Sequence, residues 1–465
     1  MDLEFDPGSF KDPEGRVFEH RGEVFRTLSS DAVTRMRALE DDGTLAELTD
    51  RGLLVASQLA ESSDVGLSDA DIGDTVMRHD RIPVLTYPFE WSFDMLRDGA
   101  LVTLELLQQC LDRDLMLKDA TAFNVAYHAG GMRFFDTLSI EAHAEGAPWD
   151  GYAQFCREFL FPLMLTSYRA VEFQPWLRGT LAGIPVRPFA RLLGMRDKLR
   201  APVVKHVVLQ AKLERSFADT DTEMRSSFKT MKFSKPMIAA NAAGLAKTLR
   251  GLKYEAGDSV WGNYAESHSY SADDEQVKRQ FVEQGVTRLA PESVVDLGGN
   301  IGDYSLLVAP HVERALCVDI DPACINTLYR RLRDGGPDNV VPIVGDLLNP
   351  TPALGWALAE RRDLFTRIRS DAFLALALVH HLSIGGNVPL TNVVETLRRI
   401  SPTGIVEWVD KDDAMVQRML RNRTDVFDAY TWDVFRAELE RHFSIVDTVE
   451  THGGARRLCL LQAAN

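Results

Sequence analysis

The sequence predicts an α/β fold for the C-terminal half of the chain, with an α+β region and a helical connector before it. Two observations support this prediction. In the second half, apolar runs of strand length alternate with stretches of helical periodicity, as a parallel sheet with crossover helices requires. The first run leads into a glycine-rich turn, DLGGNIGDYS. Seven strands are predicted, over residues 294–297, 315–319, 340–344, 372–378, 404–408, 443–449 and 457–462.

The length of the chain predicts more than one domain. Its 465 residues exceed what a single hydrophobic core ordinarily supports. A polar stretch between Glu214 and Lys235 is typical of an exposed connector. We therefore predict a first domain over residues 1–200, a helical connector over 201–260 and a second domain over 261–465.

The composition narrows the classes of partner. A formal net charge of -16 repels nucleic acid on average, which disfavours it as a partner. The five cysteines form no CxxC pair, which argues against a disulfide framework or a zinc site and favours a reducing cytoplasm. The acidic N-terminus has no apolar targeting region, and no apolar run is long enough to cross a bilayer. We expect a cytoplasmic protein with a small-molecule partner, without a membrane partner and without a metal; the sequence leaves the oligomeric state open.

The glycine-rich turn after the first predicted strand is the clearest candidate for a ligand site. Gly298, Gly299 and Gly302 let the backbone turn sharply and approach a ligand where a Cβ atom would collide. Asn300 stands between them, and asparagine tolerates a left-handed backbone better than most residues. A turn of this kind suits either an adenosyl ligand or a dinucleotide.

Acidic residues end the first three predicted strands. Asp296 precedes the glycine turn, Asp319 ends the second strand and Asp346 follows the third. A carboxylate at the position of Asp319 can accept hydrogen bonds from both hydroxyls of a ribose. The alternative is that the three acids only cap helices or turns. Their occurrence at three successive strand ends favours a ligand site.

Four segments together carry a family resemblance: YPFEW at Tyr87, LKDATAFN at Leu117, DLGGNIGDYS at Asp296 and LALVHHL at Leu376. They resemble bacterial nodulation-protein-like methyltransferases, and the resemblance spans most of the chain. It implies a class I methyltransferase with a Rossmann-like sheet and S-adenosylmethionine as cofactor. Trp261, Tyr264 and Tyr270 resemble the aromatic lead-in that covers this cofactor. The implied cofactor-binding residues are Asp296, Gly298, Gly299, Asn300, Gly302, Asp319, Ile320, Asp346, Leu347 and Tyr264.

Two adjacent histidines, His380 and His381, follow the fourth predicted strand and should emerge at the carboxyl edge of the sheet, beside the methyl group. Methyl transfer is an in-line displacement, so the protein must chiefly align the acceptor and, where it is acidic, remove its proton. A neutral imidazole can remove that proton. At least one of the two histidines is expected to have only a structural role, and the sequence does not say which.

The first half contains a second constellation. A long amphipathic helix is predicted over residues 87–115, and it leads into LKDATAFNVAYHAGGMRFFD. The spacing of Asp119, Asn124 and Asp136 resembles the catalytic loop and metal-binding aspartate of protein kinases and small-molecule phosphotransferases. However, Lys118 stands where a histidine-arginine pair is common, and neither a glycine-rich phosphate loop nor a VAIK-like strand is found. The alternative is a tight loop whose polar side chains satisfy backbone groups.

These patterns predict an S-adenosylmethionine-dependent methyltransferase that acts on a small-molecule or metabolite acceptor. O-methylation is favoured over N- or C-methylation, because the fourth strand ends in the histidine pair and lacks the Asn-Pro-Pro-aromatic motif that serves the amines of nucleobases. A non-catalytic, kinase-like first domain would bind or present the acceptor. Two alternatives stay open: a kinase-like phosphotransferase with an adenosyl-binding regulatory domain, and a non-catalytic binding protein.

Overall fold

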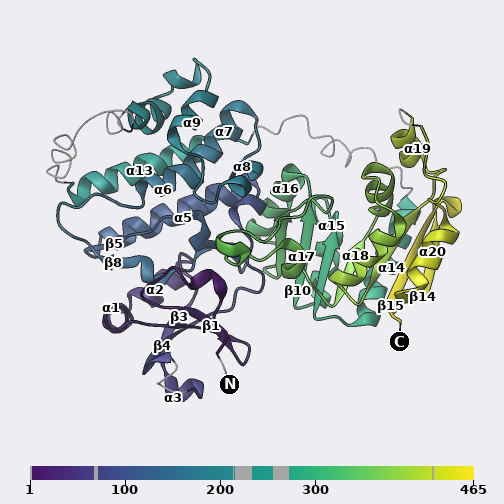
Figure 1. Cartoon of the computed structure of the whole chain (residues 1–465), viewed down its shortest axis with the longest axis horizontal. Coiled ribbons are helices and arrows are strands. Elements are labelled where there is room, and N and C mark those ends of the chain that lie inside the picture. Colours follow the sequence, from purple (N-terminus) through teal and green to yellow (C-terminus); the bar gives the residue numbers. More distant parts are fainter. Residues whose placement is uncertain are drawn as a thin grey trace. The chain divides into compact units, whose positions relative to one another are not determined.

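The computed structural model describes residues 3–67, 72–212, 214, 233–254, 272–421 and 424–464 (Figure 1). Contacts between residues divide the chain into two compact units. Unit 1 comprises Met1–Gly257 together with Leu354–Arg361, and unit 2 comprises Asp258–Ala353 together with Arg362–Asn465. The short segment Leu354–Arg361 therefore has its main contacts in unit 1, although the residues on either side of it belong to unit 2.

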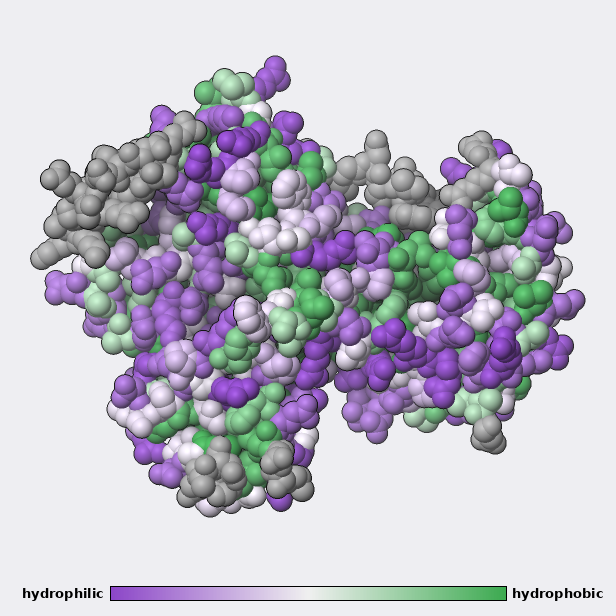
Figure 2. Space-filling model, in the orientation of Figure 1, coloured by the Kyte–Doolittle hydropathy of each residue, from purple (hydrophilic) through white to green (hydrophobic). Residues whose placement is uncertain are grey.

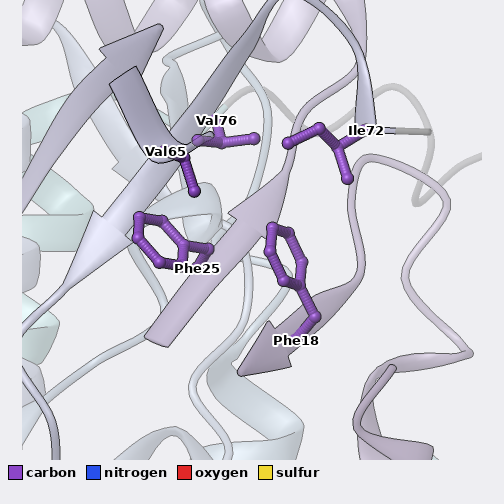
Figure 3. Packing of buried hydrophobic residues seen from close by; sticks show 5 residues of the cluster. All are labelled: Phe18, Phe25, Val65, Ile72 and Val76. Carbon is purple, nitrogen blue, oxygen red and sulfur yellow. The ribbon is translucent and has the colours of Figure 1, made fainter. Parts of the chain in front are cut away.

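Unit 1 begins with an antiparallel sheet of four strands in the order β1-β2-β4-β3. Arg21 and Gly22 form the turn between the first two strands, and both have a positive φ (50° and 83°), as tight hairpins require. The core against this sheet is built around Phe18 and Phe25, whose stacked rings have centroids 5.6 Å apart (Figure 3). Val65, Ile72 and Val76 complete this cluster. The strands are β1 (Val17–His20), β2 (Glu23–Thr27), β3 (Ser57–Glu61) and β4 (Thr75–His79).

The longest helix of unit 1 is α5 (Phe93–Leu111), and it is shorter than the predicted range 87–115. A 3₁₀ turn, η2 (Pro88–Glu90), precedes it, and Asp114 takes a left-handed conformation with a φ of 59° shortly after it ends. A second long helix, α13 (Lys235–Gly251), packs along α5, where Gln108 Nε2 donates to the carbonyl of Ala239 at 2.7 Å. The loop 117–124 packs against α5 through its 3₁₀ turn η3 (Ala122–Asn124).

Two short antiparallel strand pairs enclose that loop. They are β5 (Leu115–Leu117) with β8 (Ile140–Ala142), and β6 (Val125–His128) with β7 (Gly131–Phe134). The other main helices of unit 1 are α1 (Ser30–Asp41), α2 (Thr44–Asp50), α3 (Ser62–Val65), α6 (Tyr152–Phe155), the π-helix η5 (Cys156–Leu160), α7 (Phe161–Arg169), α8 (Gln174–Gly179), α9 (Val186–Leu192), η6 (Asp197–Leu199), α10 (Ala201–Val203) and the π-helix η7 (Val204–Val208). None of the helices in the described ranges is long and apolar enough to cross a membrane.

Unit 2 is built on one sheet of seven strands in the order β11-β10-β9-β12-β13-β15-β14. The first five strands in this order run parallel, and β15 and β14 are antiparallel to their neighbours. The predicted number of strands is confirmed. The strands are β9 (Ser293–Leu297), β10 (Arg314–Asp319), β11 (Val340–Val344), β12 (Ala372–Ala375), β13 (Thr403–Val409), β14 (Phe443–Thr451) and β15 (Arg456–Ala463).

The strand order reverses between β9 and β12. The chain first moves outward from β9 to β11 and then returns to pair β12 with the other side of β9. Because crossovers between parallel strands are right-handed, the helices before and after this return cover opposite faces of the sheet. Accordingly α14 packs on α15, and α18 packs on α20 (Figure 1). The helices are α14 (Ala272–Leu289), α15 (Asp303–Val308), α16 (Pro322–Arg333), α17 (Leu364–Arg367), α18 (Leu390–Ile400), α19 (Ala414–Leu420) and α20 (Trp432–Glu440).

The fourth strand is shorter than predicted. The apolar run 372–378 suggested a strand through residue 378, but β12 ends at Ala375. Ala377 takes a left-handed backbone with a φ of 49°, which turns the chain out of the sheet. Such a conformation is unfavourable for alanine and occurs most often near functional sites. The π-helix η10 (His381–Gly385) begins four residues after this bend.

Candidate active site

The loop after β9 lies at the point where the strand order reverses, which is where open α/β sheets bind ligands. Gly298 and Gly302 have φ values of 74° and 79°. A Cβ atom on Gly299 would lie 2.5 Å from the sulfur of Cys317, so only glycine fits there. Asn300 also adopts the left-handed conformation, with a φ of 52°. The backbone requirements predicted for this turn are therefore met at each of these residues.

Asp319 at the end of β10 is tied to the glycine loop. Its Oδ2 accepts a hydrogen bond from the backbone N–H of Asn300 at 2.8 Å, and its Oδ1 accepts one from the N–H of Asp321 at 2.8 Å. Burial is the main cause that raises the pKa of Asp319, and the two N–H groups oppose that shift. Since a carboxylate has about four acceptor positions, both oxygens can accept a further hydrogen bond.

Asp296 and Asp346 lie on the same edge of the sheet. Asp296 is 2% exposed and accepts from the hydroxyl of Ser305 at 2.8 Å. Burial raises its pKa to about 6. Asp346 is half-buried after β11, and its Oδ1 accepts from the N–H of Leu348 at 2.8 Å, which fixes the turn there. The carboxylates of the three predicted acids thus differ: Asp296 is the most buried, and Asp319 and Asp346 each accept a hydrogen bond from the backbone two residues further on.

The remaining predicted contacts are apolar or lie outside the described residues. Ile320 is 52% exposed directly after Asp319. Leu347 lines a small apolar pocket together with Leu297 and Leu378. Tyr264 lies outside the described residues, as do Trp261 and Tyr270.

The histidine pair follows β12, the strand next to β9. The rings of His380 and His381 have centroids 4.1 Å apart. His380 is 1% exposed, and neither of its ring nitrogens has a hydrogen-bond partner within the described ranges. Burial, together with His381, Arg456 and Lys278, lowers the pKa of His380 well below 6.5, and burial lowers the pKa of His381 to about 4. Both imidazoles are therefore neutral at pH 7.

A buried network of charges, which the sequence analysis missed, lies close to His380. Lys278 of α14 donates to Glu407 Oε2 at 2.7 Å, and the two side chains are 5% and 0% exposed. Arg456 Nη1 is 3.8 Å from Glu407, and Arg456 Nε donates to Asp413 at 2.8 Å. Lys278 comes from a helix before the sheet and Arg456 from its last strand, so spacing along the sequence gave no indication that they would meet.

In unit 1, the structure brings Asn124 and Asp136 together. Asn124 Nδ2 donates to Asp136 Oδ2 at 3.1 Å, and Ser139 donates to the same oxygen at 2.5 Å. The other oxygen of Asp136 accepts from Arg26 at 2.6 Å, and Arg26 also pairs with Asp12. Burial and the charge of Asp136 raise the pKa of Asp119. Both oxygens of Asp136 are thus already engaged by the chain itself.

Glu158 of the π-helix η5 holds the loop 117–124 in place. Glu158 accepts from the hydroxyl of Thr121 at 2.6 Å and from the N–H of Ala122 at 2.9 Å. Burial raises the pKa of Glu158 to about 7. In the described part of the chain, no group of three or more His, Cys, Asp or Glu side chains is placed to hold a metal ion. Thr121 and Asn124 thus hold the conformation of this loop through their hydrogen bonds.

The fold of unit 2 is that of the class I methyltransferases. The reversed strand order, the antiparallel end of the sheet and the glycine loop after β9 are the features of this fold.

One sequence relative matches nearly the whole chain. No model of a protein family matches the chain. The chain is 36% identical over 454 residues to nodulation protein NoeA of Rhizobium meliloti (strain 1021), and the match covers 97% of this chain and 94% of that protein. The chain belongs to the family of nodulation protein NoeA.

Solved structures with a similar fold match less than half of the chain. N-methyltransferase NodS from Bradyrhizobium japonicum WM9, in complex with S-adenosyl-L-homocysteine, is 14% identical with a TM-score of 0.31, over 45% of this chain and 94% of that protein. The bifunctional kinase-methyltransferase WbdD is 17% identical with a TM-score of 0.30, over 43% and 41%. Magnesium protoporphyrin IX methyltransferase (ChlM) from Synechocystis PCC 6803, with bound S-adenosylhomocysteine, is 15% identical with a TM-score of 0.30, over 43% and 92%.

Proposed function

We propose that the chain transfers the methyl group of S-adenosylmethionine to a hydroxyl group of a small-molecule acceptor, at the carboxyl edge of the sheet in unit 2. The observation that carries this proposal is the position of Asp319. One backbone N–H fixes each of its oxygens, and further lone pairs on both oxygens can accept the two hydroxyls of a ribose. A small acceptor agrees with the net charge of -16, which repels nucleic acid.

The same edge offers partners for the rest of the cofactor. The Oδ1 atom of Asn300 is buried without a hydrogen-bond partner in the described ranges, and it can accept from the amino group of the methionine part. Asp296 adds negative charge below the glycine loop. Bound S-adenosylmethionine supplies a sulfonium whose methyl carbon is already activated for displacement. The residues proposed to hold it are Asp296, Gly298, Gly299, Asn300, Gly302, Asp319, Ile320, Asp346 and Leu347, with Tyr264 as a further predicted contact.

His380 and His381 are proposed to orient the acceptor and receive its proton. A hydroxyl oxygen that gains a methyl group becomes far more acidic than an imidazolium, so a histidine with a pKa of about 4 is basic enough to take the proton. His381 is partly exposed, whereas His380 is buried beneath it. We therefore assign proton acceptance to His381 and the alignment of its ring to His380.

Unit 1 is proposed to be a kinase-like module that binds or presents the acceptor without transferring phosphate. Its Asp119, Asn124 and Asp136 have the order of a phosphotransferase site. The guanidinium of Arg26, however, occupies one oxygen of Asp136, while Asn124 and Ser139 occupy the other. An internal cation thus neutralises the carboxylate that would otherwise hold magnesium.

A kinase-like phosphotransferase with an adenosyl-binding regulatory unit is the second candidate function. The assembly of Asn124 and Asp136 within hydrogen-bond distance favours it. Hydrolysis or transfer of the γ-phosphate of ATP by the full chain, dependent on magnesium and lost in Asp136→Ala, would establish this candidate in place of the non-catalytic module.

The acceptor atom can be identified directly. The full chain is incubated with S-adenosylmethionine carrying a ¹³C-labelled methyl group and a small-molecule extract of the source cells, and the labelled product is isolated for NMR. We expect the label in the chemical-shift range of an O-methyl group. Label on nitrogen or carbon, or label only in macromolecules, would contradict the proposal.

The assignment of the base is tested on the same product. His381→Ala should lower kcat by about 100-fold, which is the usual contribution of a positioned base, and leave the affinity for S-adenosylhomocysteine unchanged. His311→Ala is the matched control, because the side chain of His311 lies outside the histidine pair and is 33% exposed. An equal loss of cofactor affinity in His381→Ala would mean that this histidine supports the fold of the site instead.

A further inference from the structure

The segment Gln174–Lys212 of unit 1 has a charge opposite to that of the chain as a whole. It contains one acidic residue, Asp197, and eight basic residues, so its formal charge is +7 in a chain of net charge -16. We call it the basic segment. Its basic residues are Arg178, Arg187, Arg191, Arg196, Lys198, Arg200, Lys205 and Lys212, of which all but Arg178 and Lys198 are exposed.

The acidic residue of the basic segment is turned inward. Asp197 is 6% exposed, and its carboxylate lies 3.5 Å from Arg169 and 3.6 Å from Arg200. It also accepts a hydrogen bond from the N–H of Gly194 at 3.0 Å. The outer surface of the segment therefore presents cations without an exposed carboxylate of its own.

The same segment carries two strongly exposed apolar side chains. Leu199 is 82% exposed and Met195 is 79% exposed, and these are the two highest values among the large apolar residues that the structure describes. Trp176, Val204 and Leu209 are exposed by 36%, 39% and 49%. Single exposed apolar residues are ordinary, but five of them within one basic segment make this segment a candidate interaction surface.

Backbone hydrogen bonds hold the turn that carries Met195 and Leu199. The N–H of Lys198 donates to the carbonyl of Gly194 at 3.2 Å, and the N–H of Arg200 donates to the carbonyl of Asp197 at 3.0 Å. These bonds and the Asp197 carboxylate fix the 3₁₀ turn η6 between α9 and α10. Figure 2 shows hydrophilic and hydrophobic residues next to each other at the end of unit 1 where Figure 1 labels α9. The apolar side chains are thus exposed on a fixed support.

We infer that the basic segment is a docking surface for an anionic membrane. Cations that lie at the level of the headgroups, with apolar side chains that enter the acyl boundary between them, are what binding to an anionic lipid surface requires. Nucleic acid would explain the cations but not the exposed leucine and methionine, because phosphates gain nothing from apolar side chains. This peripheral contact would replace the expectation from the sequence of no membrane partner, and it needs no helix that crosses the bilayer.

The inference is tested by sedimentation of the full chain with vesicles. The two kinds of vesicle are phosphatidylcholine alone, and phosphatidylcholine in which a third of the lipid is phosphatidylglycerol. We expect binding to the anionic vesicles, little binding to the neutral ones, and a weaker affinity at high salt. Equal binding to both kinds of vesicle, or none to either, would overturn the inference.

Two pairs of substitutions separate the apolar from the charged contribution. Met195→Ser with Leu199→Ser should weaken binding to anionic vesicles by about tenfold or more. Arg191→Gln with Arg196→Gln should weaken it by about fivefold for each arginine. The matched controls are Val426→Ser, at a residue that is 71% exposed, and Arg279→Gln with Arg398→Gln, at two exposed arginines of unit 2. The controls should bind like the unchanged chain.

The unfolding temperature and the affinity for S-adenosylhomocysteine should be the same in all of these variants, because the substituted side chains are exposed. If both variants of the basic segment bind vesicles normally, the segment is not the docking surface. Tighter retention of a single-stranded RNA than of anionic vesicles would identify a nucleic-acid surface instead. A dimer that Met195→Ser with Leu199→Ser dissociates would identify an interface between copies of the chain. Each of these results contradicts the inference.

Discussion

Two loops in this chain gather carboxylates, and they use them in opposite ways. In unit 2, Asp319 is held by two backbone N–H groups, which fix its position but leave both oxygens able to accept a ligand. In unit 1, both oxygens of Asp136 are taken by side chains of the same unit, and one of these is the cation Arg26. Carboxylates fixed by backbone groups remain available, whereas a carboxylate paired with a side-chain cation is neutralised. Residue type and order alone do not distinguish the two cases.

The largest expected effect is that of replacing Asp319, whose oxygens can still accept a ligand. Asp319→Ala removes both of the proposed hydrogen bonds to the ribose, which together should contribute about 4 kcal/mol, so the affinity for S-adenosylhomocysteine should fall by about 1000-fold. Calorimetry on the full chain measures this. Asp334→Ala, at an acid whose side chain is 67% exposed, is the matched control and should bind normally. Normal binding by Asp319→Ala would remove the contrast between the two loops.

The pairing of Asp136 in unit 1 is tested by removing Arg26, the cation that contacts it. Arg26→Met leaves Asp136 and Asp12 without their shared guanidinium, and the loss of one partner from a largely buried pair should destabilise unit 1 by about 3 kcal/mol. Chemical denaturation measures this change. Arg81→Met is the control, because Arg81 and Glu19 are 48% and 55% exposed and contribute less than about 1 kcal/mol.

Arg26→Met also has a catalytic readout. Binding of S-adenosylhomocysteine should not change, and ATP should not be turned over. Magnesium-dependent ATP turnover that appears only in Arg26→Met would show that Arg26 inhibits a competent phosphotransferase site. Unit 1 would then contain a catalytic site and not a non-catalytic module.

A smaller effect is expected from the glycine loop itself. An added Cβ on Gly299 meets Cys317 at 2.5 Å and the carboxylate of Asp296 at 2.8 Å, so Gly299→Ala should cost about 2 kcal/mol of strain and weaken cofactor binding by about tenfold or more. Gly251→Ala is the control, because a Cβ there meets nothing within 4 Å. That change should leave binding intact and alter stability by less than about 1 kcal/mol. Equal behaviour of the two variants would mean that the loop is not tightly packed.

The smallest effect is a pH dependence. Burial raises the pKa of Asp296 to about 6, so this carboxyl is protonated below that pH and ionised above it. A cofactor with positive charge prefers the ionised form. Its affinity should therefore rise with pH up to about 6 and then level off, by at most about tenfold for each pH unit. Asp296→Asn should flatten this profile for S-adenosylmethionine. A profile that is flat in the unchanged chain would separate Asp296 from the cofactor site.

The sequence predicted the parts of unit 2 that depend on local pattern. The number of strands, the backbone of the glycine loop and the placement of the histidines on the edge of the sheet follow from apolar runs and glycine spacing. The end of β12 was wrong because the left-handed conformation of Ala377 has no counterpart in composition. Lys278 and Arg456 were missed because they meet at Glu407 only through the folded sheet.

In unit 1, too, contacts between distant parts of the sequence were missed. The spacing of Asp119, Asn124 and Asp136 was visible in the sequence, and the structure brings the last two together. Arg26 is 110 residues away from Asp136 in the sequence, so its pairing with Asp136 could not be inferred from spacing. A carboxylate can bind a ligand only if no cation of the chain pairs with it. Such a cation can come from a distant element, so only the tertiary structure reveals it.

The central claim is that the carboxylate of Asp319 and the glycine loop after β9 bind an adenosyl ligand. Titration of the unmodified full chain with S-adenosylhomocysteine in a calorimeter tests it most directly. The account predicts saturable binding of one equivalent, with no comparable heat when ATP and magnesium replace the nucleoside. A titration that shows no binding of S-adenosylhomocysteine, in a chain that melts cooperatively, would contradict it.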